Sequence, residues 1–133
     1  MPVQGNQPVQ DDRNLSKKLL FRLSKAPYGR SLAREAIDAV LAAAAFEQDV
    51  SVLFMGDGVY QLLKDQNPTA IEQKNFTASF GLFTLYGINQ VYALDTDLTE
   101  RGLSPAQLLL PVTPLDRERL TALLRAQDQI LSF

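Results

Sequence analysis

The stretch from Val52 to Gln66 reads VLFMGDGVYQLLKDQ and carries the clearest sign of the fold. An apolar run ends at Gly56, Asp57 and Gly58, and a second apolar pattern with helical spacing follows directly. A buried strand that leads through a glycine turn into a helix is typical of parallel α/β proteins. Because such sheets bind ligands beyond the carboxyl ends of their strands, this turn is a candidate binding site.

The rest of the chain continues the alternation of strands and helices. Apolar runs predict strands at residues 17–23, 50–55 and 90–94, near 111–112, and at 129–133. Helical patterns and breakers predict helices at residues 31–46, 59–63, 75–87 and 95–102, from 104, and from 113 to about 127. We therefore expect one α/β domain, a three-layer α/β/α sandwich with a mainly parallel five-stranded sheet.

Residues 17–133 contain all of these elements, and residues 1–16 contain none. This amino-terminal stretch is polar, and it lacks the basic and apolar regions of a signal peptide, so we expect a disordered tail, with a partner-binding arm that orders on contact as the alternative. No apolar run approaches the roughly 20 residues that span a bilayer, and we expect no membrane insertion. The formal net charge of -2 does not favour direct binding of nucleic acid.

The chain contains no cysteine and no histidine. This composition excludes thiol nucleophiles, persulfide carriers, and thiolate or imidazole ligands for a metal. It also excludes the usual general base near pH 7. We therefore expect no catalytic residue, no cofactor and no metal site, although an enzyme that uses carboxylates, lysine or tyrosine stays an alternative.

The glycine turn itself matches a dinucleotide fingerprint only in part. Gly56 and Gly58 fit the first two positions of Gly-x-Gly-x-x-Gly, but Gln61 occupies the third. The carboxylate of Asp57 between the glycines would repel a pyrophosphate. We interpret the turn as structural, with Asp57 as the N-cap of a helix that starts at Val59.

Several segments together resemble a known family. They are APYG (26–29), REAIDAVLAAAAF (34–46), GDGVYQLLKDQNP (56–68), DLTERGL (97–103), TPL (113–115) and DQILSF (128–133). These segments look like the TusC/DsrF family, within the DsrE/DsrF-like superfamily. The resemblance covers residues 18–133, and its most specific part is residues 57–63.

The resemblance implies a role in a cytoplasmic sulfur-relay complex. Members of this family assemble with TusB-like and TusD-like subunits, or with DsrH-like and DsrE-like subunits, and the resemblance implies a heterohexamer. The Tus complex passes persulfide sulfur towards 2-thiolation of the wobble uridine of certain tRNAs, whereas the Dsr complex serves sulfur oxidation. Both pathways stay open on the sequence, and we favour tRNA thiolation.

The resemblance also places the main sulfur-carrying cysteine in the TusD/DsrE subunit, directly after the strand that corresponds to residues 90–94. Here that neighbourhood reads Tyr92, Ala93, Leu94 and Asp95, without sulfur. Some relatives of this subunit have cysteines nearby, so the absence of cysteine from this chain departs from the family pattern. We expect a noncatalytic structural subunit, with a nucleotide-binding or small-molecule-binding enzyme as the alternative.

The aromatic residues of the chain supply candidate partner contacts. Phe76, Phe80 and Phe83 recur at helical spacing, which fits packing against the sheet or a subunit interface. We take Tyr60, Phe80 and Phe83 as the candidate interface residues, because large apolar side chains are favoured anchors at interfaces.

Overall fold

The computed structural model describes residues 16–26, 32–63 and 79–133 of the chain. In chain order the elements are β2 (Lys18–Leu23), α2 (Leu32–Ala45), β3 (Asp49–Phe54), the 3-10 helix η1 (Gly56–Leu62), a helix over residues 79–85, β4 (Val91–Leu94), α4 (Asp95–Glu100), the 3-10 helix η2 (Pro105–Gln107), β5 (Thr113–Leu115), α5 (Arg117–Arg125) and β6 (Gln129–Ser132). This order confirms the predicted α/β architecture.

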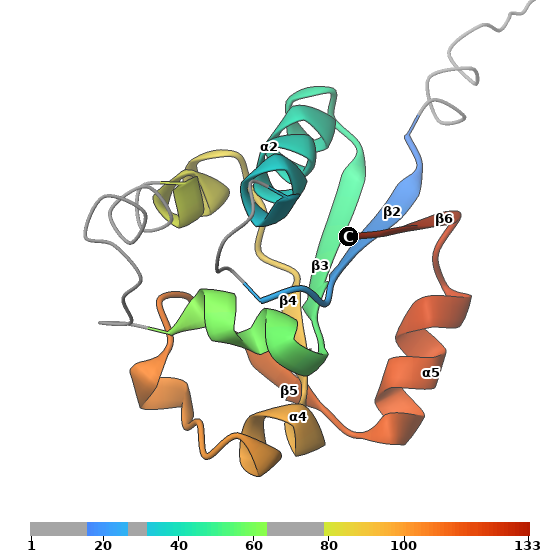
Figure 1. Cartoon of the computed structure of the whole chain (residues 1–133). Helices are drawn as coiled ribbons and strands as arrows, with labels where there is room; N and C mark the ends of the chain where they lie inside the picture. Colours follow the sequence, from blue (N-terminus) through green and yellow to red (C-terminus); the bar gives the residue numbers. More distant parts are fainter. Residues whose placement is uncertain (1–15, 27–31, 64–78) are drawn as a thin grey trace, which may run out of the picture.

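The five strands form one sheet in the order β5-β4-β3-β2-β6, and every neighbouring pair is parallel. From β2 to β5 the chain always moves in the same direction across the sheet, and it then returns to the far side of β2 to form β6. Since parallel crossovers are right-handed, the reversal places α5 on the face opposite α2 and the helix over residues 79–85. Figure 1 shows this arrangement, with the sheet between α2 and α5.

Alternating side chains of the strands form a separate hydrophobic core on each face of the sheet. The larger core joins Phe21, Val52 and Val91 to the buried side of α2 and to the helix over residues 79–85. The smaller core contains Leu20, Leu53, Leu94 and, from α5, Leu120. A sheet covered on both faces explains why its central strands are mostly apolar.

Two predicted boundaries near the fourth strand were wrong. β5 is formed by Thr113–Leu115 and not near Pro111. Pro114 lies in the middle of β5 and has no N–H group to donate, and it is tolerated because β5 is an edge strand. The helix predicted from Thr113 is α5, which begins only at Arg117. Its N-cap is Asp116, whose carboxylate accepts the backbone N–H of Arg119 at 2.8 Å.

Candidate functional site at the carboxyl ends of the strands

The glycine turn after β3 brings η1 into close contact with the end of β2. Gly56 has a φ of +51°, in the left-handed region that glycine adopts readily. A Cβ atom on Gly58 would lie 2.0 Å from the carbonyl oxygen of Leu23, so a side chain at this position has no room. The two glycines therefore allow the sharp turn and the close approach of backbone to backbone.

The amides of both glycines in this turn are already engaged within the chain. The N–H of Gly56 donates to a carboxylate oxygen of Asp97 at 2.8 Å, and the N–H of Gly58 donates to the carbonyl of Met55 at 2.8 Å. A bound phosphate would need free N–H donors at such a turn. Instead, a carboxylate of the chain itself takes the position of an anion at Gly56.

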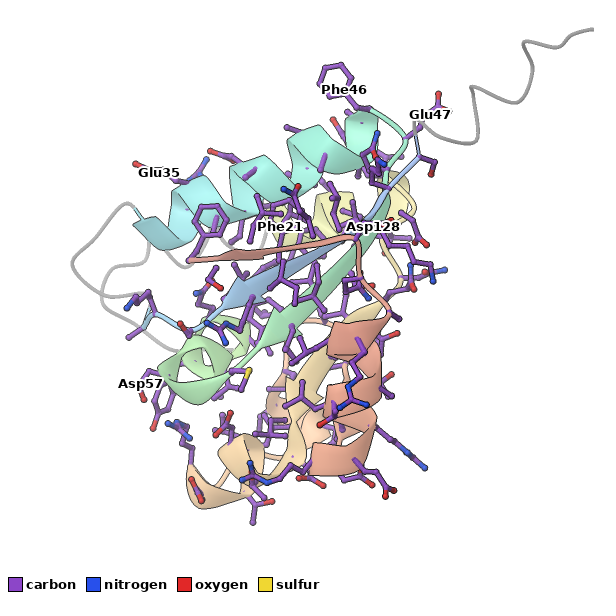
Figure 2. All side chains as sticks on the ribbon, turned by 90° about the vertical axis from the view of Figure 1, so that its right-hand side faces the viewer. Phe21, Glu35, Phe46, Glu47, Asp57 and Asp128 are labelled. Carbon is purple, nitrogen blue, oxygen red and sulfur yellow. The ribbon has the colours of Figure 1, made fainter. Side chains whose placement is uncertain are left out.

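Arg101, directly after α4, holds this network together. Its guanidinium lies 3.1 Å from the carboxylate of Asp57 and 3.6 Å from that of Asp97, and it stands 5.8 Å from the centre of the Tyr60 ring. The side chains of Arg101 and Asp97 are 19% and 15% exposed, whereas that of Asp57 is 63% exposed. The network joins η1 to α4 and leaves Asp57 at the surface, where Figure 2 labels it.

The prediction that Asp57 caps a helix was wrong. The helix after the turn is a 3-10 helix that begins at Gly56, and its N-cap position is Met55, which makes no side-chain capping bond. Asp57 therefore lies inside the first turn of the helix. Its carboxylate pairs with Arg101, a residue 44 positions further along the chain, and a local sequence pattern cannot reveal such a partner.

The position that corresponds to the sulfur carrier in the family resemblance is the junction of β4 and α4. Leu94 ends the strand and is buried, and α4 begins directly with Asp95. The carbonyl of Asp95 accepts a hydrogen bond from the Thr99 hydroxyl at 3.0 Å within the same helix. In the part of the chain that the structure describes, no group of three histidine, cysteine, aspartate or glutamate side chains could hold a metal ion.

Two of the three candidate interface residues lie in the core. Phe80 and Phe83 are each 1% exposed, and their rings meet edge to face at 5.5 Å, while Phe54 meets Phe80 at 6.1 Å. The expectation that Phe80 and Phe83 offer their surface to a partner was therefore wrong, because their helix turns them towards the sheet. Tyr60 is half-buried and stays a predicted contact, and Phe76 lies outside the described residues.

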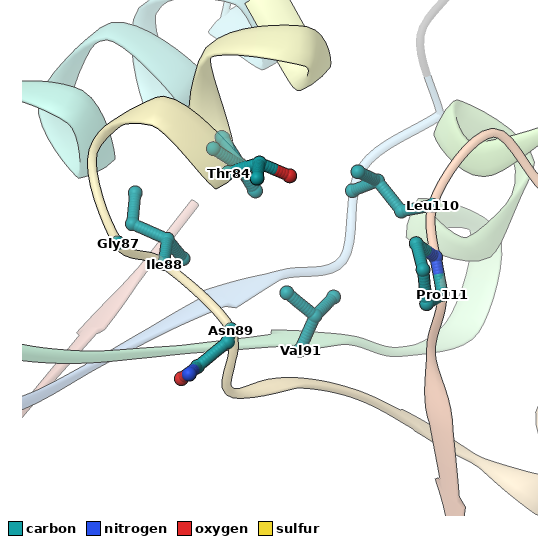
Figure 3. A pocket seen from close by; sticks show the side chains of 8 residues that line it. Thr84, Gly87, Ile88, Asn89, Val91, Leu110 and Pro111 are labelled. Carbon is teal, nitrogen blue, oxygen red and sulfur yellow. The ribbon is translucent and has the colours of Figure 1, made fainter.

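Around the same helix lies a second set of apolar side chains, of which the sequence interpretation noted only Tyr86, as a continuation of the aromatic spacing, and missed Leu82 and Leu85. Leu82, Leu85 and Tyr86 are 37%, 76% and 42% exposed, on the side away from Phe80 and Phe83. Beside them is an open hollow of about 270 Å³, between the end of this helix and the segment that contains Leu110 (Figure 3). The sequence contained a sign of this surface. A helix that packs on one core needs apolar residues on one side only, and this short helix has them on two sides.

No helix in the described ranges is long and apolar enough to cross a membrane. Among solved structures, the crystal structure of the YchN protein from E. coli aligns with a TM-score of 0.74 and 23% identity, covering 88% of this chain and 99% of that one. This similarity supports the α/β fold described above.

The sequence comparisons extend over nearly the whole domain. A protein named TusC homolog from Vibrio parahaemolyticus serotype O3:K6 is 40% identical over 116 residues, which is 87% of this chain and 98% of that protein. Protein TusC from Escherichia coli O9:H4 is 40% identical over 118 residues, which is 88% of this chain and 99% of that protein. Residues 17–133 match the DsrE/DsrF-like family. The chain therefore belongs to the DsrE/DsrF-like family, and within it to the TusC group.

Proposed function

We propose that this chain is a structural subunit of a cytoplasmic, hetero-oligomeric sulfur-relay complex. The observation that carries this proposal is the lack of any cysteine in a chain that aligns almost end to end with TusC proteins. A persulfide needs a thiol to carry it, so the sulfur must travel on other subunits. The chain then contributes surface and shape to the complex and takes no covalent part in the relay.

The partners in this proposal are TusB-like and TusD-like subunits, assembled as a heterohexamer. The TusD-like subunit would carry the persulfide, and the complex would supply sulfur for 2-thiolation of the tRNA wobble uridine. The alternative of a nucleotide-binding enzyme loses support, because Asp97 occupies the Gly56 amide that a phosphate would need.

The proposal is tested by sulfur loading. The chain, alone or co-purified with the two partner subunits, is incubated with a cysteine desulfurase, its sulfur carrier and labelled cysteine, and each subunit is then examined by intact-mass spectrometry. We expect no added sulfur on this chain in either sample and a persulfide on the TusD-like subunit. A stable sulfur adduct on this chain would overturn the structural role.

A second measurement tests the pathway. The gene is deleted in its host, and 2-thiouridine in total tRNA is measured before and after the gene is restored. We expect the modification to disappear on deletion and to return on complementation. Unchanged 2-thiouridine in the deletion strain would argue against a role in tRNA thiolation.

A further inference from the structure

Two described segments that contain β4 and β5 have no charged side chains of their own. Residues 79–94 and 102–115 include no aspartate, glutamate, lysine or arginine, although 21% of all residues in the chain are charged. The two segments meet in space, because both line the hollow shown in Figure 3. We call the exposed part of these segments, residues 81–91 and 109–114, the uncharged flank.

The uncharged flank concentrates exposed apolar side chains. Leu82, Leu85 and Tyr86 belong to one stretch of five residues, whereas Phe46 and Ile130, the other large exposed apolar side chains in the described part, are single. The most exposed of the three, Leu85, is 76% exposed. Soluble proteins seldom gather such side chains on a surface unless another molecule covers them.

The hollow adds shape to this apolar surface. Ile88 and Val91 form its floor, and Leu110 and Pro111 stand on one side of it, opposite Thr84 at the end of the helix (Figure 3). Its volume of about 270 Å³ is below the roughly 300–1,000 Å³ of pockets that enclose small ligands, and it is open to the surface. A protruding side chain of another protein suits it better than a cofactor.

The adjoining edge strand of the sheet, β5, is poorly suited to pairing with a strand of another chain. β5 has only three residues, and Pro114 in its middle lacks an N–H group. Short edge strands with proline are poor templates for pairing with another chain. Contacts at this flank would therefore be made by side chains and not by extension of the sheet.

The charge pattern restricts the partner. The hollow is lined by no charged residue, so a charged side chain that entered it would lose its hydration without meeting an opposite charge, which is unfavourable. Interface cores are likewise poor in charged residues and rich in aromatic ones. The partner surface that fits is apolar and uncharged, with one projecting aliphatic or aromatic side chain.

We infer that the uncharged flank docks a partner subunit of the sulfur-relay complex, and that an apolar side chain of this partner enters the hollow. The inference rests on the proposed function, which supplies the partner subunits. The contact residues on this helix are then Leu82 and Leu85, which are exposed, and not Phe80 and Phe83.

The test uses two variants on the flank and one control. Leu85→Glu places a charge on the most exposed side chain, and Thr84→Arg places one at the wall of the hollow. Ile130→Glu is the control, because Ile130 is an exposed apolar side chain on β6, at the opposite edge of the sheet. Thermal unfolding of each isolated variant shows whether the fold is kept.

Each variant is mixed with the two partner subunits, and the dissociation constant is measured. We expect both flank variants to weaken association by roughly 30-fold or more, the effect of losing a hot spot, and Ile130→Glu to bind like the wild type. In the wild-type complex, amide hydrogen exchange should slow at residues 81–91. Wild-type affinity in both folded flank variants, or unchanged exchange at residues 81–91, would overturn the inference.

The remaining outcomes separate the two proposals. If the wild-type chain does not associate with the partner subunits at all, the proposed function fails. If it associates but the flank variants disrupt only self-association, the flank binds a second copy of this chain and the inference is wrong. If Ile130→Glu also loses binding, hydrogen exchange at residues 81–91 in the wild-type complex shows whether the partner covers the uncharged flank.

Discussion

Glu47 ends α2 in a backbone conformation that normally belongs to glycine. Its φ is 60°, close to the values of 76° at Gly87 and 68° at Gly102, which end two other helices. At all three places the left-handed residue and the residue after it donate their N–H groups to carbonyls three and five residues back. This pair of bonds is the Schellman motif, in which glycine is preferred because it has no Cβ.

Replacing Glu47 with glycine should therefore stabilise the protein. A non-glycine residue in the left-handed region is disfavoured by about 1–2 kcal/mol, and greater freedom of glycine in the unfolded chain offsets up to about 1 kcal/mol of this. We expect Glu47→Gly to raise the free energy of unfolding by up to about 1 kcal/mol in urea titrations. Gly87→Ala, the reverse change, should lower it, and equal effects of both variants would contradict this explanation.

These positions also show what a local pattern can reveal. A glycine at the end of a helical pattern, as at Gly87, predicts a left-handed helix end, and the φ of 76° confirms this prediction. The left-handed conformation of Glu47 was not predicted, because a glutamate gives no local sign of it. Likewise, the sequence placed two glycines at the end of β3 but could not show that Gly58 touches the backbone of Leu23, since that contact joins η1 to β2, which are distant in the sequence.

Among the elements, η1 and α4 depend on each other through Asp97. One oxygen of its carboxylate accepts the Gly56 N–H at 2.8 Å, and the other lies 3.6 Å from Arg101. Asp57 contacts the same guanidinium but is far more exposed to solvent. Water and salt weaken the exposed pair, whereas the hydrogen bond of Asp97 is shielded.

We expect Asp97→Ala to be more destabilising than Asp57→Ala. Loss of the charged hydrogen bond should lower the free energy of unfolding by about 1.5–3 kcal/mol, and loss of the exposed pair by less than about 1 kcal/mol. Urea denaturation at low and at high salt measures both. A larger loss for Asp57→Ala, or a loss that salt does not reduce, would show that Asp57 has the more important role.

Over the whole molecule, two cores of unequal size hold the sheet between its helices. Phe83 lies in the larger one, against Phe80 and next to β4, and the exposed Leu85 follows two residues later in the same helix. One helix therefore carries one side chain that stabilises the fold and another that is available to a partner.

Truncation of these two side chains should change the free energy of unfolding by very different amounts. Phe83→Ala removes a buried aromatic ring and should lower the free energy of unfolding by about 3–5 kcal/mol. Leu85→Ala should change it by less than about 0.5 kcal/mol, because the side chain is mostly in solvent. Chemical denaturation of the isolated chain measures both, and a stable Phe83→Ala variant would argue against the packing described here.

The sequence predicted the number of strands and their parallel arrangement well, because apolar runs of strand length alternate with helical patterns. It could not predict the order of the strands, which depends on contacts between distant residues. For a similar reason, the sequence left open whether Phe80 and Phe83 pack against the sheet or contact a partner, and the exposure of Leu85 was missed. Apolar residues surround this helix, so spacing alone does not show which side faces the sheet.

The position of β6 has a consequence for the chain during its synthesis on the ribosome. β6 pairs with β2, so that Leu19 lies beside Gln129, and the sheet order places β2 between β3 and β6. While the ribosome is still making the residues before β6, one side of β2 has no strand beside it. Long-range parallel pairing is slow, and an open apolar edge can pair with the wrong chain. The nascent protein is thus prone to aggregation until β6 emerges, and chaperones that shield β2 should improve its yield.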